Sequence, residues 1–170
     1  GPLLFKLAGA CYRIGDRQAA CRAFEQALPG FDADPDARAL AIKTRVNLGV
    51  ALIDLGEVQS GLSHIEDALE LCRQQDDDDL LGPTLANLGL SCFQTGRRRE
   101  ARRFLREAAL LLIQNPAHDT LLASVRVALQ QLGDNAPTTL GPTTGAVASS
   151  SLGPRRAASP SPSASSGSPS

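Results

Sequence analysis

The sequence predicts an all-α fold, an α-solenoid of three helix pairs and a C-terminal capping helix, followed by a disordered tail. Residues 47–56, Asn-Leu-Gly-Val-Ala-Leu-Ile-Asp-Leu-Gly, return at 87–96 as Asn-Leu-Gly-Leu-Ser-Cys-Phe-Gln-Thr-Gly. The second glycine of this motif marks four positions spaced 41, 40 and 37 residues apart: Gly15, Gly56, Gly96 and Gly133. Sequence periods of this length are typical of solenoids.

A second pattern follows each of the first three marker glycines. Small, large and small side chains recur at one spacing: Ala20, Phe24, Ala27; Gly61, Ile65, Ala68; and Ala101, Leu105, Ala108. Intervals of four and three residues place each set on one face of a helix. Each unit is therefore predicted to be helix, glycine turn, helix. We expect a solenoid domain over 1–133, with units at about 1–33, 34–75 and 76–115 and a capping helix over 116–133.

Proline, glycine and capping residues predict the boundaries of the first four helices, at about 3–14, 17–28, 34–56 and 57–74. Pro29-Gly30 should stop the second helix. Asp34-Pro35 should open the third, because aspartate caps free amides and the missing N–H of proline costs nothing in the first turn.

Asp76 to Asp79 form the longest acidic run. The run lacks the alternating ligands and the turn glycine of a calcium loop. It is interpreted as a solvated turn whose acids complement the amino end of the next helix. Gly82-Pro83 should lie at or near the start of that fifth helix. A sixth helix is expected at about 98–113, and Asn115-Pro116 should open a seventh that ends at Gly133.

The sixth helix carries a basic cluster: Arg97, Arg98, Arg99, Arg102, Arg103 and Arg106. Such a cluster can hold phosphate or an acidic partner. Glu100 and Glu107 interleave with it, however, and favour an ordinary charged outer face.

The end of the solenoid is predicted from one position in each unit. Ala8, Gly49 and Gly89 are small where the two helices of a unit should meet, whereas the seventh helix has Arg126 there. Arginine would be excluded if an eighth helix packed at that place. The seventh helix is therefore expected to cap the third unit, as terminal repeats do. The chain begins within a helical pattern, so we expect an upstream unit to cover the first pair.

Residues 134–170 are rich in Pro, Ser, Thr, Gly and Ala. They cannot bury enough apolar surface to offset their ordering entropy, so we expect disorder, and no change in melting temperature when they are removed. Ser159 follows Arg155-Arg156 and precedes proline, which makes it a possible phosphorylation site, although motifs this short also occur by chance.

Composition excludes several function classes. A net charge of −1 gives no general attraction to nucleic acid, and no apolar run is long enough for membrane insertion. The four cysteines have no Cys-x-x-Cys spacing and are interpreted as reduced, structural residues of a cytoplasmic protein. His64 and His118 lack partners at metal-ligand spacing. We expect no metal, no cofactor and no enzyme activity, and the oligomeric state stays open.

The repeats resemble the tetratricopeptide repeat family in their leucine-glycine pair, glycine turn and alanine-aromatic-alanine pattern, over about residues 3–133. The forty-residue period and the Asn-Leu-Gly opening are most similar to the long-period variety found in Pins-type adaptors. The first unit departs from it, with Lys6-Leu7-Ala8 in place of Asn-Leu-Gly. The resemblance implies a non-catalytic scaffold that binds a protein or peptide segment in a concave groove. Two alternatives stay open: a regulatory domain of a larger enzyme or transcription regulator, and a structural assembly module.

Residues three and seven apart share a helix face, and the resemblance places four such stripes on the concave surface: Lys6, Gly9, Arg13; Asn47, Val50, Asp54; Asn87, Leu90, Gln94; and Ser124, Val127, Gln131. The side-chain amides of Asn47 and Asn87, which can donate and accept, would form hydrogen bonds with the main chain of a bound segment. Val50 and Leu90 would add apolar contact. Lys6 and Arg13 would favour an acidic ligand residue, an idea that Asp54 weakens. The alternative is that the asparagines satisfy backbone groups between helices.

Overall fold

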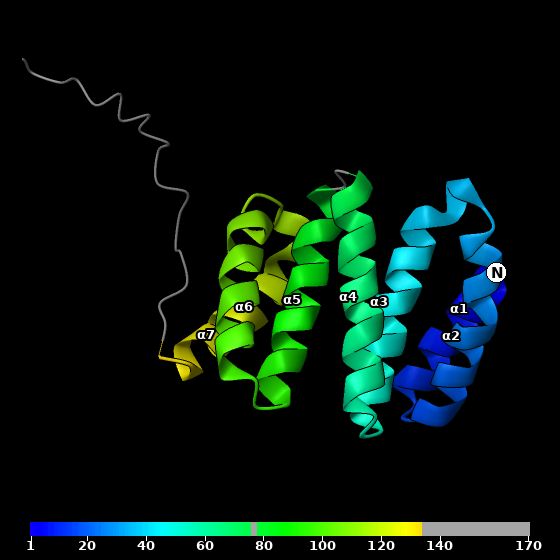
Figure 1. Cartoon of the computed structure of the whole chain (residues 1–170), viewed down its shortest axis with the longest axis horizontal. Helices are drawn as coiled ribbons and strands as arrows, with labels where there is room; N and C mark the ends of the chain where they lie inside the picture. The colour runs from blue at the N-terminus through cyan, green and yellow to red at the C-terminus, as the bar shows by residue number, and fades with distance from the viewer. Residues whose placement is uncertain (76–77, 134–170) are drawn as a thin grey trace, which may run out of the picture. The chain divides into compact units, whose positions relative to one another are not determined.

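The computed structural model describes residues 1–75 and 78–133, which belong to one unit of the chain. The described residues form seven α-helices and two short 3-10 helices (Figure 1): α1 (Pro2–Arg13), α2 (Arg17–Asp32), η1 (Pro35–Ala37), α3 (Arg38–Asp54), α4 (Val58–Gln75), α5 (Asp78–Gln94), α6 (Arg98–Leu112), η2 (Pro116–His118) and α7 (Asp119–Gln131). Consecutive helices pack as the pairs α1/α2, α3/α4 and α5/α6, and α7 packs against α5 and α6. The fold is therefore an α-solenoid, as the repeats predicted.

The four marker glycines lie just beyond the first helix of each pair and beyond α7. Their φ angles are positive, at 91°, 89°, 79° and 76° for Gly15, Gly56, Gly96 and Gly133. Residues with a Cβ atom rarely adopt this left-handed conformation, which ends a helix within one residue. The spacing of the glycines in the sequence therefore fixes where each pair turns.

The small residues that mark the helix crossings are in close contact. A Cβ atom added to Gly49 on α3 would lie 2.5 Å from the carbonyl oxygen of Gly61 on α4, and one added to Gly89 on α5 would lie 2.7 Å from Cγ of Leu105 on α6. Ala8, the corresponding residue of α1, is fully buried. The predicted close approach of the paired helices is confirmed.

The prediction that Pro29-Gly30 stops the second helix is wrong. Helix α2 continues through both residues to Asp32. Proline removes one helical hydrogen bond, but Pro29 lies on the exposed side of the helix. The extra turn buries Phe31, which is 3% exposed and makes an edge contact with the ring of Phe5 at a centroid distance of 6.4 Å. Burial of this aromatic ring offsets the lost hydrogen bond.

Pro35 lies at the start of a helix, whereas Pro83 lies inside one. The Asp34 side chain accepts a hydrogen bond from the Asp36 amide at 3.0 Å, as a capping residue does, but Asp34-Pro35 opens the short η1 rather than the third helix, since α3 begins at Arg38. Pro83, expected at or near the start of its helix, is the sixth residue of α5, which begins at Asp78. Of the acidic run, residues 76–77 lie outside the described part of the chain.

All four cysteines are free. Cys21, Cys72 and Cys92 are buried, whereas Cys11 is half-buried. Desolvation by burial raises the pKa of Cys92 to about 11 and also raises the pKa of Cys21. Cys92 is thus a small residue of the core, and Cys11 lies at the edge of the core.

The basic cluster of α6 has a structural role at two positions. Arg98 and Arg102 donate to the carbonyl oxygens of Gln131 and Leu132, at 3.4 and 2.7 Å. These carbonyls belong to the carboxyl end of α7, where the helix leaves acceptors without a partner and cations are favourable. The two arginines therefore attach α7 to the third pair. No helix of the described residues is long and apolar enough to cross a membrane.

Candidate functional site

The helices α1, α3 and α5 share a face that contains a hollow of about 220 Å³. We call this surface the inner face. The hollow is lined by residues from all three helices: Phe5; Ile42, Lys43, Val46 and Asn47; and Pro83, Thr84 and Asn87. Residues far apart in the sequence therefore meet at one place because the first helices of the pairs lie next to one another.

The lining of the hollow is apolar at its base and polar at its margin. Ile42 and Val46 at its base are 1% and 7% exposed, and they are joined there by one buried polar side chain, that of Thr84. Asn47 and Lys43 are exposed, and Asn87 is half-buried. An apolar floor with a few polar groups at the rim is the usual composition of a ligand-binding pocket. The two asparagines predicted from the repeated motif are both among these rim residues.

One N–H of the Asn87 side chain already makes a hydrogen bond within the protein. Its Nδ2 donates to the carbonyl oxygen of Pro83 at 2.8 Å, within the same helix. A side-chain amide has a second N–H and a carbonyl oxygen. Asn87 thus partly fits the alternative role of satisfying a backbone group, although the partner belongs to its own helix rather than to a neighbouring one.

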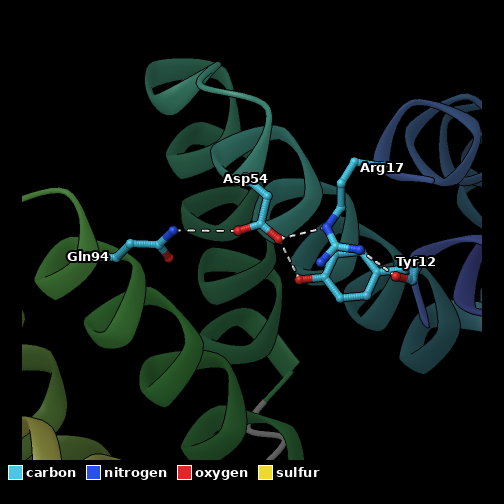
Figure 2. Close-up of polar contacts among 4 residues, drawn as sticks. All are labelled: Tyr12, Arg17, Asp54 and Gln94. Atoms are coloured by element: carbon cyan, nitrogen blue, oxygen red, sulfur yellow. Dashed lines mark hydrogen bonds and ion pairs between the residues drawn. The ribbon is translucent and has the colours of Figure 1, made fainter. Parts of the chain in front are cut away.

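A polar cluster lies at the carboxyl ends of the inner helices (Figure 2). The carboxylate of Asp54 on α3 accepts hydrogen bonds from the Tyr12 hydroxyl at 2.7 Å, from Nε of Arg17 at 3.0 Å and from Nε2 of Gln94 at 3.5 Å. Arg17 also donates to the Tyr12 carbonyl oxygen, and its guanidinium lies 3.9 Å from the centre of the Tyr12 ring. We call these four residues the Asp54 cluster; they join α1, α2, α3 and α5.

The cluster shifts two pKa values in opposite directions. Desolvation, followed by the hydrogen bond to Asp54, raises the pKa of Tyr12 to about 12. Desolvation alone would raise the pKa of Asp54, but the hydrogen bonds from Tyr12, Gln94 and Arg17 and the charge of Arg17 lower it overall. The cluster therefore stabilises a neutral phenol beside an ionised carboxylate.

The other predicted groove residues are distributed along the same helices. Val50 and Leu90 are half-buried, next to the core. Lys6 and Arg13 are exposed on α1, and the Arg13 guanidinium lies 3.6 Å from the place that a Cβ atom of Gly9 would occupy. Neither the hollow nor the Asp54 cluster includes a residue of α7, where the last stripe lies exposed: Ser124, Val127 and Gln131.

Eight residues of this surface were not among the predicted groove residues: Phe5, Ile42, Lys43, Val46, Pro83 and Thr84 of the hollow, and Tyr12 and Arg17 of the Asp54 cluster. Tyr12 had a detectable signal, because the equivalent positions in the next two units are Ile53 and Phe93. A hydroxyl at a position that is otherwise apolar suggests a specific acceptor. Arg17 is the first residue of α2, directly after the turn at Gly15, and nothing in the sequence pattern marked it as a partner of another unit.

The described residues offer no arrangement for metal chemistry. Residues 1–75 and 78–133 contain no group of three or more His, Cys, Asp or Glu side chains that would hold a metal ion. His64 is half-buried on α4, and His118 lies in η2. The predicted phosphorylation site Ser159 and the predicted tail lie outside the described residues.

Comparison with known proteins identifies the repeats. The family model of the tetratricopeptide repeat matches residues 38–109, which span α3 to α5 and most of α6. The family expected from the sequence is confirmed, while the Pins-type variety stays a prediction. A search of curated proteins found no match.

Two solved structures share the fold. The first is the Rap conjugation gene regulator of the plasmid pLS20 in complex with the Phr* peptide, with 22% sequence identity, a TM-score of 0.66, and coverage of 78% of this chain and 37% of that one. The second is aspartyl phosphate phosphatase F from Bacillus subtilis, with 16% identity, a TM-score of 0.66 and coverage of 76% and 35%. The chain thus spans little more than a third of the length of either protein.

Proposed function

Because residues 38–109 form tetratricopeptide repeats, we propose that the chain is a non-catalytic protein-interaction scaffold. It binds a segment of a partner polypeptide along the inner face of α1, α3 and α5. The partner is a protein or peptide, and neither nucleic acid nor a membrane is the ligand.

The observation that carries this proposal is the position of the two repeated asparagines. Asn47 and Asn87 stand at the same position of consecutive units and line the same hollow. These two side chains come from neighbouring helices and line one space, where the N–H and C=O groups of a bound main chain would both need partners. A side-chain amide can donate to one and accept from the other.

The apolar floor supplies the second part of the binding surface. Phe5, Val46 and Pro83 come from three different helices and surround the same space. An apolar side chain of the partner would lose its contact with water there, which favours binding by about 25 cal/mol for each Å² of buried apolar area. Val50 and Leu90 extend the apolar strip toward the Asp54 cluster.

The Asp54 cluster changes the proposed role of two groove residues. Asp54 accepts hydrogen bonds from Tyr12 and Arg17 of the first pair and from Gln94 of the third. We therefore assign Asp54 and Gln94 to holding α1, α3 and α5 in register, rather than to direct contact with the partner. Arg17 also compensates the charge of Asp54, so Asp54 no longer opposes the preference of Lys6 and Arg13 for an acidic residue in the ligand.

The test begins with peptides selected for binding from a random displayed library. Their affinity for the 170-residue chain is measured by calorimetry, together with the double variant Asn47→Ala, Asn87→Ala. Each asparagine should contribute about 1 kcal/mol, and up to about 3 kcal/mol where its loss leaves a buried group without a partner. The matched control is Gln130→Ala, which shortens an exposed amide on α7.

The proposal predicts that the double variant loses binding while its thermal unfolding stays cooperative, and that the control keeps full affinity. Unchanged affinity of a correctly folded double variant would refute the role of the inner face. In that case the bound peptide should be located by cross-linking from the edges of the solenoid.

A further inference from the structure

A second hollow, of about 410 Å³, lies between α4 and α6, the second helices of the second and third pairs. It belongs to the layer of second helices, whereas the inner face belongs to the first helices. Its floor is apolar, because it is formed by Leu69, Leu88 and Phe104, which are buried residues of α4, α5 and α6. Its walls carry charged side chains of α4 and α6. We call this space the outer hollow.

Two polar contacts between the second pair and the third bound the outer hollow. Near the amino ends of α4 and α6, Arg97 donates to the side-chain oxygen of Gln59 at 3.1 Å. Toward their carboxyl ends, Arg73 and Glu107 form an ion pair at 3.7 Å. A helix lying along α4 and α6 would have to break one of these contacts. The outer hollow is therefore suited to a short segment that enters between them.

Between these two contacts the walls of the outer hollow carry opposite charges that do not pair. Glu66 stands on α4, seven residues before Arg73, so both side chains are on the side of the helix that lines the hollow. Arg103 stands on α6, four residues before Glu107, and lines the hollow as well. Within residues 1–75 and 78–133, neither Glu66 nor Arg103 takes part in an ion pair. The Arg103 guanidinium instead lies 4.5 Å from the centre of the Phe104 ring.

The other acids beside the outer hollow already have polar partners. Glu70, the second acid of the α4 wall, accepts a hydrogen bond from the Gln74 side chain at 3.1 Å. Glu100, one turn before Arg103 on α6, pairs with Arg97 at 3.6 Å. A ligand in the middle of the hollow would therefore meet one carboxylate without a partner on α4 and one guanidinium without an anion on α6.

We propose that the outer hollow binds a short segment of a partner protein in which an apolar residue is flanked by a basic residue on one side and an acidic residue on the other. The apolar side chain contacts the floor, the basic residue pairs with Glu66, and the acidic residue pairs with Arg103. Flanks of a single sign would pair with one wall and meet a like charge on the other, which is unfavourable. The two walls thus select a segment that carries both charges, and they fix its orientation across the hollow.

The experiment uses three synthetic peptides with uncharged ends, each with one leucine between two charged residues. The flanks are one arginine and one glutamate in the mixed peptide, two arginines in the second and two glutamates in the third. Nuclear magnetic resonance titration of the isotope-labelled 170-residue chain measures weak binding and locates it. The mixed peptide should bind about tenfold more tightly than either of the others, with shifted amide signals around Glu66 and Arg103. Because the mixed peptide has no net charge, a general electrostatic attraction would not favour it.

Reversing one wall should remove this preference in a defined direction. Arg103→Glu should cancel the advantage of the mixed peptide over the two-arginine peptide, and Glu66→Lys should cancel its advantage over the two-glutamate peptide. The matched controls are Arg99→Glu and Asp67→Lys, which make the same charge changes at exposed residues of the same helices outside the hollow. Both controls should keep the preference for the mixed peptide. All four substitutions alter exposed side chains, so thermal unfolding should change little.

Three results would overturn the proposal. Equal binding of the three peptides, or equal effects of Arg103→Glu and Arg99→Glu, would show only non-specific adhesion. Shifted signals confined to the inner face would place the peptide elsewhere. A dimer in sedimentation velocity that Arg103→Glu dissociates would identify the outer hollow as a contact between copies of the chain. The double variant Asn47→Ala, Asn87→Ala should bind the mixed peptide normally, so the tests of the two surfaces are independent.

Discussion

The hydroxyl of Tyr12 on α1 donates a 2.7 Å hydrogen bond to the carboxylate of Asp54 on α3, across an interval of 42 residues. The same carboxylate accepts from Gln94 of the next unit. One acid thus connects the first helices of three consecutive units. Because neighbouring units of a solenoid contact only each other, such a connection coordinates helices whose spacing determines the inner face.

The ionisation of Tyr12 provides a direct test of this contact. Its pKa is raised to about 12, first by desolvation and then by the hydrogen bond to Asp54. Tyr12 is the only tyrosine and the chain has no tryptophan, so the ultraviolet absorbance of the phenolate reports on this residue alone. The midpoint should lie near 12, and Asp54→Asn should move it toward the ordinary value of about 10. Circular dichroism at each pH verifies that the helices persist, and a midpoint near 10 in the unaltered protein would contradict the contact.

Stability at acidic pH should depend on Asp54. Its pKa in the folded protein is below the unfolded value of about 3.9, so its contribution to stability is present above that value and is lost as the pH falls through the folded pKa. Urea unfolding should therefore show Asp54→Asn less stable than the unaltered protein near neutral pH. The difference should shrink below about pH 4. A difference that is constant with pH would mean that the charge of Asp54 is not involved.

Gly49→Ala should destabilise the protein, by roughly 2 kcal/mol or more. Its Cβ atom would lie 2.5 Å from the Gly61 carbonyl oxygen, which cannot move without separating α3 from α4. The control is Gly9→Ala on α1, where the nearest atom is at 3.6 Å, at the end of the flexible Arg13 side chain. That change should stabilise by about 0.5–1 kcal/mol, because alanine is the better helix former. Urea unfolding measures both, and similar effects of the two substitutions would contradict the close helix crossing.

Arg102→Ala should loosen α7. The residue donates to the Leu132 carbonyl oxygen at 2.7 Å, and its removal should cost about 1.5 kcal/mol, as for hydrogen bonds from a charged donor. Arg99→Ala is the control, because Arg99 is exposed, and it should change stability by less than about 0.5 kcal/mol. Hydrogen exchange should locate the loss of protection in α7. Faster exchange spread evenly over all the helices would instead indicate that Arg102 supports the whole solenoid.

The fold was predictable because it depends on local signals that recur. Each turn needs a glycine with positive φ, so the spacing of Gly15, Gly56 and Gly96 predicts where the units lie. Each helix crossing needs a small side chain, which repeats with the same period. The extension of α2 past Pro29 was not predictable in the same way. It depends on the burial of Phe31 against Phe5 and Ala41, contacts that join different parts of the sequence.

The candidate site was predictable only in part. Asn47 and Asn87 repeat at one position, so the motif itself selected them, and both line the hollow. The partners of Asp54 could not be found from periodicity. Tyr12 differs from Ile53 and Phe93 at its equivalent positions, whereas Arg17 corresponds to Val58 and Arg98, and neither comparison identifies Asp54 as the contact. Periodicity can show that a residue is unusual for its position, but not which residue of another unit it contacts.

The burial of the cysteines has a practical consequence for following the protein in solution. Cys21, Cys72 and Cys92 are buried, and burial raises the pKa of Cys21 and Cys92, so few of these thiols ionise near neutral pH. Cys11 is the accessible thiol among the described residues. A maleimide dye should therefore attach there first, without any engineered labelling position. Cys11 lies four residues from Leu7 and therefore next to it on the helix, so the emission of the dye would report when another molecule covers this side of α1.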